Sequence, residues 1–170
     1  MKKIAINLLV FQVGWAVCVI GGDLYAVAFT LPALMLHNWL ILGNRGEWRF
    51  IVMIALAGCL WDITMVQTGT IQYANASLLG IPLWLLCLWL LFATTFMHAL
   101  FWLHRYLWLA AVFAAVLGPA SYWFGTHLTE ARLDPPIIAS LGVMAVGWAV
   151  LFPFGMYYAG KIKALEEEAC

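Results

Sequence analysis

The chain has 170 residues, of which 66% are hydrophobic and only 9% are charged. Soluble domains carry about 25% charged residues, so this composition excludes a soluble globular fold and predicts a polytopic membrane protein. The formal net charge is zero. The chain therefore lacks the excess of basic residues typical of nucleic-acid binding, and we expect no nucleic-acid partner.

Six apolar segments are long enough to cross a bilayer as helices, which takes about 20 residues. Because these runs are apolar on all sides, we predict an all-α fold, a bundle of six transmembrane helices, in one domain over residues 1–160. Residues 161–170 are expected to form a cytoplasmic tail. The six segments cover residues 4–22, 24–43, 50–68, 80–103, 107–124 and 137–159.

The shortest predicted connection is the first one, where only residues 21–23 separate two spans. A tight helical hairpin fits there, since Gly21 and Gly22 admit the backbone angles that such a turn requires. The alternative is that residues 4–43 form one span and one interfacial helix, which would reduce the count to five. The basic start of the chain also resembles a signal peptide. Its apolar core is long and further spans follow, so we predict a first span.

The basic residues favour six spans, because seven of the eight fall at the predicted inner ends of the helices. The positive-inside rule then places both termini in the cytoplasm and the loops at 68–77 and 126–136 on the outer face. A five-span chain would put the termini on opposite sides and divide these charges. The seven residues are Lys2, Lys3, Arg45, Arg49, Arg105, Lys161 and Lys163, and the exception is Arg132.

Packing between the spans is expected to rely on small residues, because lipid offers no hydrophobic drive for helix association. Two spans carry such residues at four-residue spacing, so each presents a face suited to close helix contact. These faces are Ala110, Ala114 and Gly118 in one span and Gly14, Cys18 and Gly22 in the other.

The spacing of cysteines and histidines predicts neither a metal site nor a cofactor site. The four cysteines form no CxxC pair, and three of them lie in apolar runs, where a free thiol behaves as a small hydrophobe. None of the four histidines lies three or four residues from another. Two histidines and an amide would leave the first coordination shell of a metal incomplete.

The most unusual residue for a membrane span is Asp62, in the stretch GCLWDITMV. With a rise of about 1.5 Å per residue, it lies about 18 Å above the inner end of its span. Thr30 and Ser121 reach similar heights on other spans, so we expect hydroxyl partners for it but no Lys or Arg. Ionisable residues inside a membrane are functional candidates by default. The alternative is that Asp62 fixes the register of packed helices.

A second polar layer is predicted closer to the inner face. His37 and His98 lie about 9 Å and about 8 Å from the inner ends of their spans, with Asn38 and Thr94 within a turn or two. Thr94 and His98 are four residues apart and share a helix face. We treat Asp62, His98 and His37 as candidate catalytic residues. The alternative for each histidine is a structural hydrogen bond to a neighbouring helix.

The stretches NLLVFQVGWAVCVIGG, LWDITMVQTG, LFATTFMHALFWL and LGPASYWFGTHL form a recognisable set. Together they resemble a family of short inner-membrane proteins of unknown function, the DUF2878 type. The resemblance implies a several-span fold in a bacterial inner membrane and a role in modifying or handling membrane lipids. It adds Gln12 and Tyr122 to Asn38 and Thr94 as expected residues of a polar cavity. The matching polar positions are Gln12, Trp15, Asp62, His98, Pro119 and Tyr122.

Three functions follow from these features, and each makes a different structural demand. A lipid-handling protein, as enzyme or accessory subunit, predicts that the polar layers line a cavity reached by an acyl chain of a membrane lipid. An enzyme predicts in addition that Asp62 and His98 both face that cavity. A structural or assembly subunit predicts that both polar groups bond within helix pairs and that a face of alanine and glycine is exposed to lipid, where it binds another membrane protein. A small proton-coupled transporter predicts an aqueous path between the two polar layers. Whether the protein is an enzyme stays open.

Overall fold

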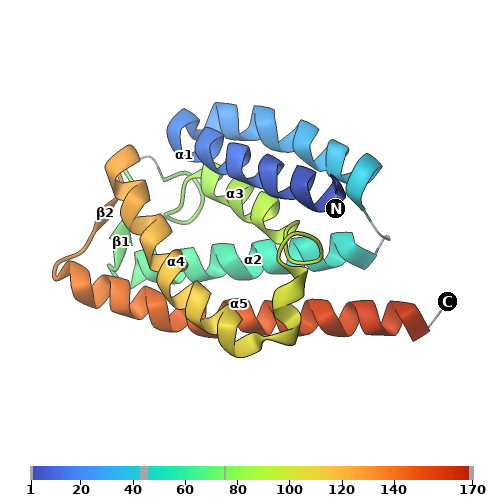
Figure 1. Cartoon of the computed structure of the whole chain (residues 1–170). Coiled ribbons are helices and arrows are strands. Elements are labelled where there is room, and N and C mark those ends of the chain that lie inside the picture. Colours follow the sequence, from blue (N-terminus) through green and yellow to red (C-terminus); the bar gives the residue numbers. More distant parts are fainter. Residues whose placement is uncertain (1, 43–45, 75, 169–170) are drawn as a thin grey trace.

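A computed structural model of the chain describes residues 2–42, 46–74 and 76–168. Within these ranges the protein is all-α, as predicted, apart from two very short strands (Figure 1). The elements are α1 (Lys2–Leu36), the π-helix η1 (His37–Ile41), α2 (Gly46–Gln67), β1 (Ile71–Gln72), α3 (Leu83–Ala93), the 3-10 helix η2 (Phe101–Arg105), α4 (Leu107–Leu128), β2 (Arg132–Leu133) and α5 (Ile137–Glu168).

Helix α1 consists of two helices joined by a tight turn. Gly22 has φ 70° and ψ −168°, a positive-φ conformation that glycine adopts without steric cost. The two halves run back along each other (Figure 1). They pack so closely that a Cβ atom on Gly14 would lie 2.9 Å from Cε1 of Phe29. The turn predicted at residues 21–23 is therefore present, at Gly22.

The number of membrane-spanning helices differs from the prediction. The predicted span at 80–103 contains the 11-residue α3, which is too short to cross a bilayer, followed by turns and η2. Six full-length spanning helices are therefore not confirmed. Four helices in the described residues are long and apolar enough to cross a membrane, namely Lys2–Ile41 taken as one unit, Gly46–Gln67, Leu107–Leu128 and Ile137–Leu165.

Two threonines lie at the break after α3 and bond locally to the backbone. The hydroxyls of Thr94 and Thr95 donate to the carbonyl three residues earlier, at 2.7 and 2.6 Å. Such local bonds offer the backbone an alternative to the α-helix. The next amides also bond three residues back, as His98 N does to Thr95 O at 3.2 Å. The threonines that we expected inside a continuous span thus lie where its α-helix ends.

The two ends of the bundle hold different features. The described start of α1 and the end of α5 lie at one end, and the Gly22 turn and both strands lie at the other (Figure 1). β1 pairs antiparallel with β2, so the loops predicted together on the outer face, 68–77 and 126–136, meet there. Asp23 accepts a hydrogen bond from Trp84 N at 2.9 Å, which joins the α1 turn to the start of α3.

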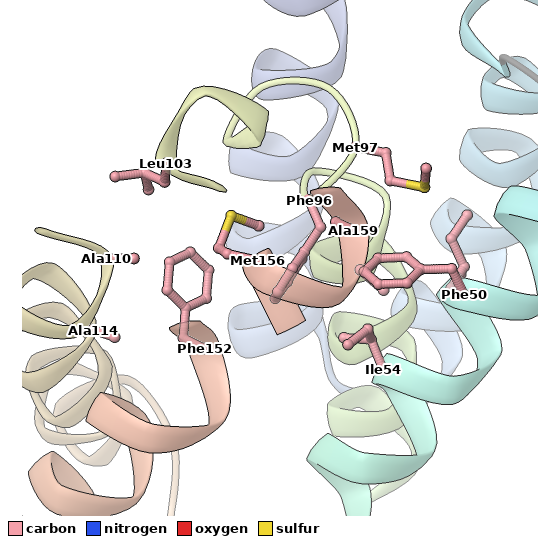
Figure 2. Packing of buried hydrophobic residues seen from close by; sticks show 12 residues of the cluster. Phe50, Ile54, Phe96, Met97, Leu103, Ala110, Ala114, Phe152, Met156 and Ala159 are labelled. Atoms are coloured by element: carbon pink, nitrogen blue, oxygen red, sulfur yellow. The ribbon is translucent and has the colours of Figure 1, made fainter. Parts of the chain in front are cut away.

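The largest core cluster joins α2, α4, α5 and the segment after α3 (Figure 2). Aromatic rings within it meet edge to face, such as Phe50 and Phe96 with centroids 5.8 Å apart, an arrangement that the ring quadrupole favours. Ala110 and Ala114 are buried in the same cluster. The small-residue face of this span therefore packs inside the protein.

Glycine–tryptophan contacts bring helices unusually close, and two of them surround a central pair of indoles. A Cβ atom on Gly58 would lie 2.1 Å from the ring of Trp89, and one on Gly118 would lie 2.4 Å from the ring of Trp148. The two indoles stack on each other, with centroids 5.3 Å apart and planes 14° apart. Glycine at both positions therefore lets α2 and α4 approach this central stack.

Candidate functional sites

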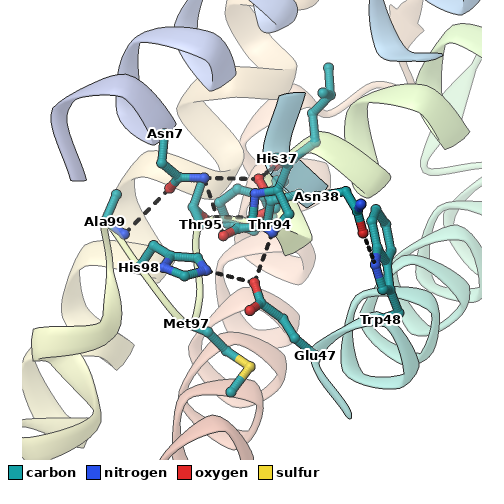
Figure 3. Close-up of polar contacts among 12 residues, drawn as sticks. Asn7, His37, Asn38, Glu47, Trp48, Thr94, Thr95, Met97, His98 and Ala99 are labelled. Atoms are coloured by element: carbon teal, nitrogen blue, oxygen red, sulfur yellow. Dashed lines mark hydrogen bonds and ion pairs between the residues drawn. The ribbon is translucent and has the colours of Figure 1, made fainter. Parts of the chain in front are cut away.

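His37, Glu47 and His98 form a buried polar cluster between η1, the first turn of α2 and the segment after α3 (Figure 3). Glu47 Oε1 lies 2.8 Å from His37 Nε2 and 2.6 Å from His98 Nε2. The side chains of His37 and Glu47 are each 3% exposed and that of His98 is 13% exposed. Both imidazoles thus point at one carboxylate oxygen.

The helix that carries His37 has unusual geometry. His37 begins η1, and its carbonyl accepts a hydrogen bond from Leu42 N, five residues on, at 2.8 Å. Short π-helical segments are rare and occur frequently at functional sites. The next residue, Asn38, accepts a hydrogen bond from Trp48 Nε1 at 3.1 Å (Figure 3), which links η1 to the start of α2 beside Glu47.

Asn7 of α1 supports the broken segment that carries His98. Its Nδ2 donates to the carbonyl and hydroxyl oxygens of Thr94, at 3.3 and 3.2 Å, and its Oδ1 accepts from Ala99 N at 3.4 Å (Figure 3). Irregular backbone inside a membrane protein requires such internal partners, because lipid supplies none. One side chain thus satisfies backbone groups on both sides of His98.

Glu47 is a central residue of the polar cluster that the sequence did not reveal. It lies between basic residues in the short stretch NRGEWRF, where an acidic residue reads as a solvated loop charge. The structure places it in the first turn of α2, where the helix dipole favours a carboxylate. One sequence feature could have indicated Glu47. It lies close to the predicted membrane boundary near which His37 and His98 were already expected.

Asp62 is fully buried and is bonded by two aromatic side chains. Trp89 Nε1 of α3 donates to Oδ2 and the Tyr122 hydroxyl of α4 donates to Oδ1, each at 2.5 Å. The carboxylate therefore joins three helices. Within the described ranges no Lys or Arg forms an ion pair with it, which agrees with the sequence.

The expected hydroxyl partners of Asp62, Thr30 and Ser121, were wrong, because its bonds come from Trp89 and Tyr122. Ser121 Oγ donates instead to the carbonyl of Gly118, at 2.7 Å on its own helix. The partner on α4 is the adjacent Tyr122, because its longer side chain reaches across to α2. Counting residues along a helix gives the depth of each side chain in the membrane. It does not show which sides of two neighbouring helices contact each other.

A mostly apolar cavity of about 660 Å³ lies between the first half of α1, α3 and α4, with α5 behind it. Gln12 and Tyr122, two of the predicted cavity residues, line it. Tyr73, from the β1 loop, also lines it, and burial raises the pKa of this phenol well above its usual value. Its hydroxyl is therefore protonated and available as a donor.

The predicted site residues thus separate into two groups. His37, His98, Asn38 and Thr94 belong to the polar cluster or to its immediate supports (Figure 3). Gln12 and Tyr122 belong to the cavity wall, with Asp62 bonded behind Tyr122. Neither Asp62 nor His98 lines this cavity, so it is not the shared cavity that the enzyme hypothesis demanded.

These features define a helical multi-pass membrane protein. In the described part of the chain, four apolar helices are long enough to span when Lys2–Ile41 is taken as one unit. Large apolar side chains point outward along them, such as Leu9 and Val146 at 64% and 68% exposure. Outward apolar side chains of this density suit a lipid environment.

The chain belongs to the family described as "Protein of unknown function (DUF2878)", whose sequence model matches residues 4–154. The predicted family is thereby confirmed. Searches of curated proteins and of solved structures found no match.

Proposed function

We propose that this protein binds an acyl chain of a membrane lipid in the cavity between α1, α3 and α4, as an enzyme or accessory subunit of lipid handling. The observation that carries this proposal is the cavity itself. Small-molecule sites typically measure about 300–1,000 Å³ and are mostly apolar with a few polar groups. A cavity of about 660 Å³ in a lipid-embedded protein falls within this range.

The polar groups of the cavity would set which lipid binds. The free energy of a lipid tail changes little when it moves from other tails to an apolar protein surface, because the two environments are equally apolar. Selectivity must then come from shape and from hydrogen bonds to a head group or a functional group on the chain. Gln12 and Tyr73 line the cavity and carry groups able to form them, whereas the hydroxyl of Tyr122 already donates to Asp62.

Native mass spectrometry of the detergent-purified protein tests this proposal. We expect about one lipid to be retained per chain, and we expect Ala120→Phe, which adds a ring to the cavity wall, to reduce its occupancy. Ala139→Phe, on the exposed start of α5, is the matched control and should retain the lipid. Equal retention by both variants would contradict the proposal.

The same proposal includes a membrane orientation. We infer six passes, two from the α1 hairpin and one from the broken segment that runs from α3 through η2, with both termini on the cytoplasmic side of a bacterial inner membrane. Seven of eight basic residues fall at the predicted inner ends, and the described start of α1 and the end of α5 lie at one end of the bundle (Figure 1). Reporter fusions at the two termini test it, and opposite locations would refute it.

The two alternative functions have less support. An assembly subunit was expected to bond its polar groups between helices, as Asp62 does with Trp89 and Tyr122. It was also expected to expose a small-residue face, yet the face formed by Ala110, Ala114 and Gly118 is buried against neighbouring helices. A proton-coupled transporter needs a polar path between the two groups of polar residues, whereas the wall of the described cavity is mostly apolar. Lipid binding therefore remains the function that this geometry supports best.

A further inference from the structure

The polar cluster outside the lipid cavity has the composition of a metal site. The Nε2 atoms of His37 and His98 and a carboxylate oxygen of Glu47 all lie within 4.8 Å of one another. The imidazole planes are 74° apart, with centroids separated by 5.3 Å. The rings therefore do not stack on each other, and their nitrogens converge on one point near the carboxylate (Figure 3).

We propose that His37, Glu47 and His98 bind a divalent transition-metal ion of the Zn²⁺ or Fe²⁺ class. Two imidazoles and one carboxylate form the protein ligand set of several catalytic zinc sites and of the non-haem iron facial triad. Imidazole nitrogen selects transition ions over Mg²⁺ and Ca²⁺, which prefer oxygen ligands. Three protein ligands leave a coordination position for water or a substrate.

The distances require only a small rearrangement. A four-coordinate ion with ligands at about 2.0–2.1 Å spaces its ligand atoms by about 3.4 Å. The His37–Glu47 and His98–Glu47 separations are 2.8 and 2.6 Å, so each must widen by roughly 0.6–0.8 Å. Side-chain torsions can supply this change without moving the helices.

The backbone around the cluster is built in a way that supports a site. His37 lies in a π-helix, and His98 lies in the irregular segment that follows the end of α3. Discontinuous helices inside membrane proteins are tolerated where protein buries them, and they recur at binding sites. Asn7, which reaches both sides of His98 from a distant helix, holds that irregular segment in place.

The affinity of this site should be moderate. Metal-ligating histidines usually donate their second ring nitrogen to a carboxylate or carbonyl, and loss of that partner typically costs about 10–100-fold in affinity. His37 Nδ1 is buried and has no hydrogen-bond partner among the described residues. The orientation of this ring therefore depends on packing, including its edge-to-face contact with Trp48.

Metal titration of the full-length chain in detergent, after stripping with a chelator, tests the proposal. We expect one Zn²⁺ per chain by elemental analysis. We expect His98→Ala and Glu47→Gln to weaken binding by roughly 100-fold, at least the loss seen for outer-shell partners. His127→Ala is the matched control, because His127 is exposed at the end of α4, and its affinity should equal that of the wild type.

Electron paramagnetic resonance of the Cu²⁺-loaded wild type gives a second test that needs no variant. Nitrogen hyperfine structure from two imidazoles is expected, because copper accepts imidazole ligands. Wild-type protein without stoichiometric Zn²⁺ binding, a spectrum without two imidazoles, or a folded His98→Ala variant with wild-type affinity would each overturn the proposal. Lipid retention is measured separately, so either proposal can fail alone.

Discussion

Asp62 and Glu47 are both carboxylates buried in the described part of the chain, but they are paired with different kinds of hydrogen-bonding partner. Asp62 accepts hydrogen bonds from an indole N–H and a phenol O–H. Both are uncharged donors, and they fix the orientation of the carboxylate. Glu47 contacts two imidazoles, whose ring nitrogens can bind metals. The comparison teaches that burial alone does not identify a functional carboxylate, because the chemistry of its partners decides what it can do.

The largest effect is expected when Asp62 is removed. Asp62→Leu leaves the Trp89 and Tyr122 donors buried without acceptors, and each unsatisfied donor costs about 1–3 kcal/mol. We therefore expect the free energy of unfolding, measured by SDS titration in mixed micelles, to fall by about 2–6 kcal/mol. Asp62→Asn keeps one acceptor oxygen and should lose about half as much. An unchanged stability for Asp62→Leu would show that the three-helix junction is not structural.

The tryptophan stack that supports Asp62 should be the next most sensitive feature. A Cβ on Gly118 would lie 2.4 Å from the Trp148 ring, so Gly118→Ala forces the indole to move, and such overpacking costs about 1–3 kcal/mol. The same titration measures it. Gly142→Ala is the control, because its Cβ would meet open space. It should be neutral or stabilising by up to about 1 kcal/mol through helix propensity.

Much of the fold follows from the sequence by simple physical rules. Apolar runs of span length predict α2, α4 and α5, and glycine at position 22 predicts the α1 turn. The break after Ala93 does not follow in this way, because Thr94 and Thr95 are tolerated within many helices. Only tertiary partners such as Asn7 decide that their local bonds prevail.

The membrane depth of the candidate site residues could be predicted from the sequence, but the contacts between them could not. Counting residues along each helix placed His37 and His98 at one depth, and they do meet. The same counting paired Asp62 with the wrong hydroxyls and ignored Glu47, because the rotation of each helix and the path of a connecting loop are set by packing. Function could be inferred from the sequence only as a set of alternatives.

A smaller effect is expected at Glu47. Glu47→Gln keeps an amide oxygen that an imidazole N–H can still bond, but it removes the charge that strengthens both contacts, since hydrogen bonds to charged groups contribute about 1.5–3 kcal/mol and neutral ones about 1. We expect a loss of about 1–2 kcal/mol by SDS titration. A loss larger than that of Asp62→Leu would reverse the comparison and make Glu47 the main structural carboxylate.

The smallest losses of stability are expected at the two asparagines beside the cluster, Asn7 and Asn38, and the two losses should differ. The bonds of Asn7 are buried but long, at 3.2–3.4 Å, so Asn7→Ala should cost about 1 kcal/mol. That cost should fall on the broken segment. Hydrogen exchange of the Ala99 amide, which Asn7 caps, should therefore accelerate more than exchange in the middle of α5.

Asn38 provides the contrast, because its bond to Trp48 is solvent-exposed. Asn38→Ala should cost less than about 0.5 kcal/mol, as for most surface substitutions. It should also leave the exchange of the Ala99 amide unchanged. If Asn38→Ala instead accelerates that exchange as much as Asn7→Ala does, η1 and the broken segment open together. The cluster would then be a single mobile unit, unlike the fixed junction at Asp62.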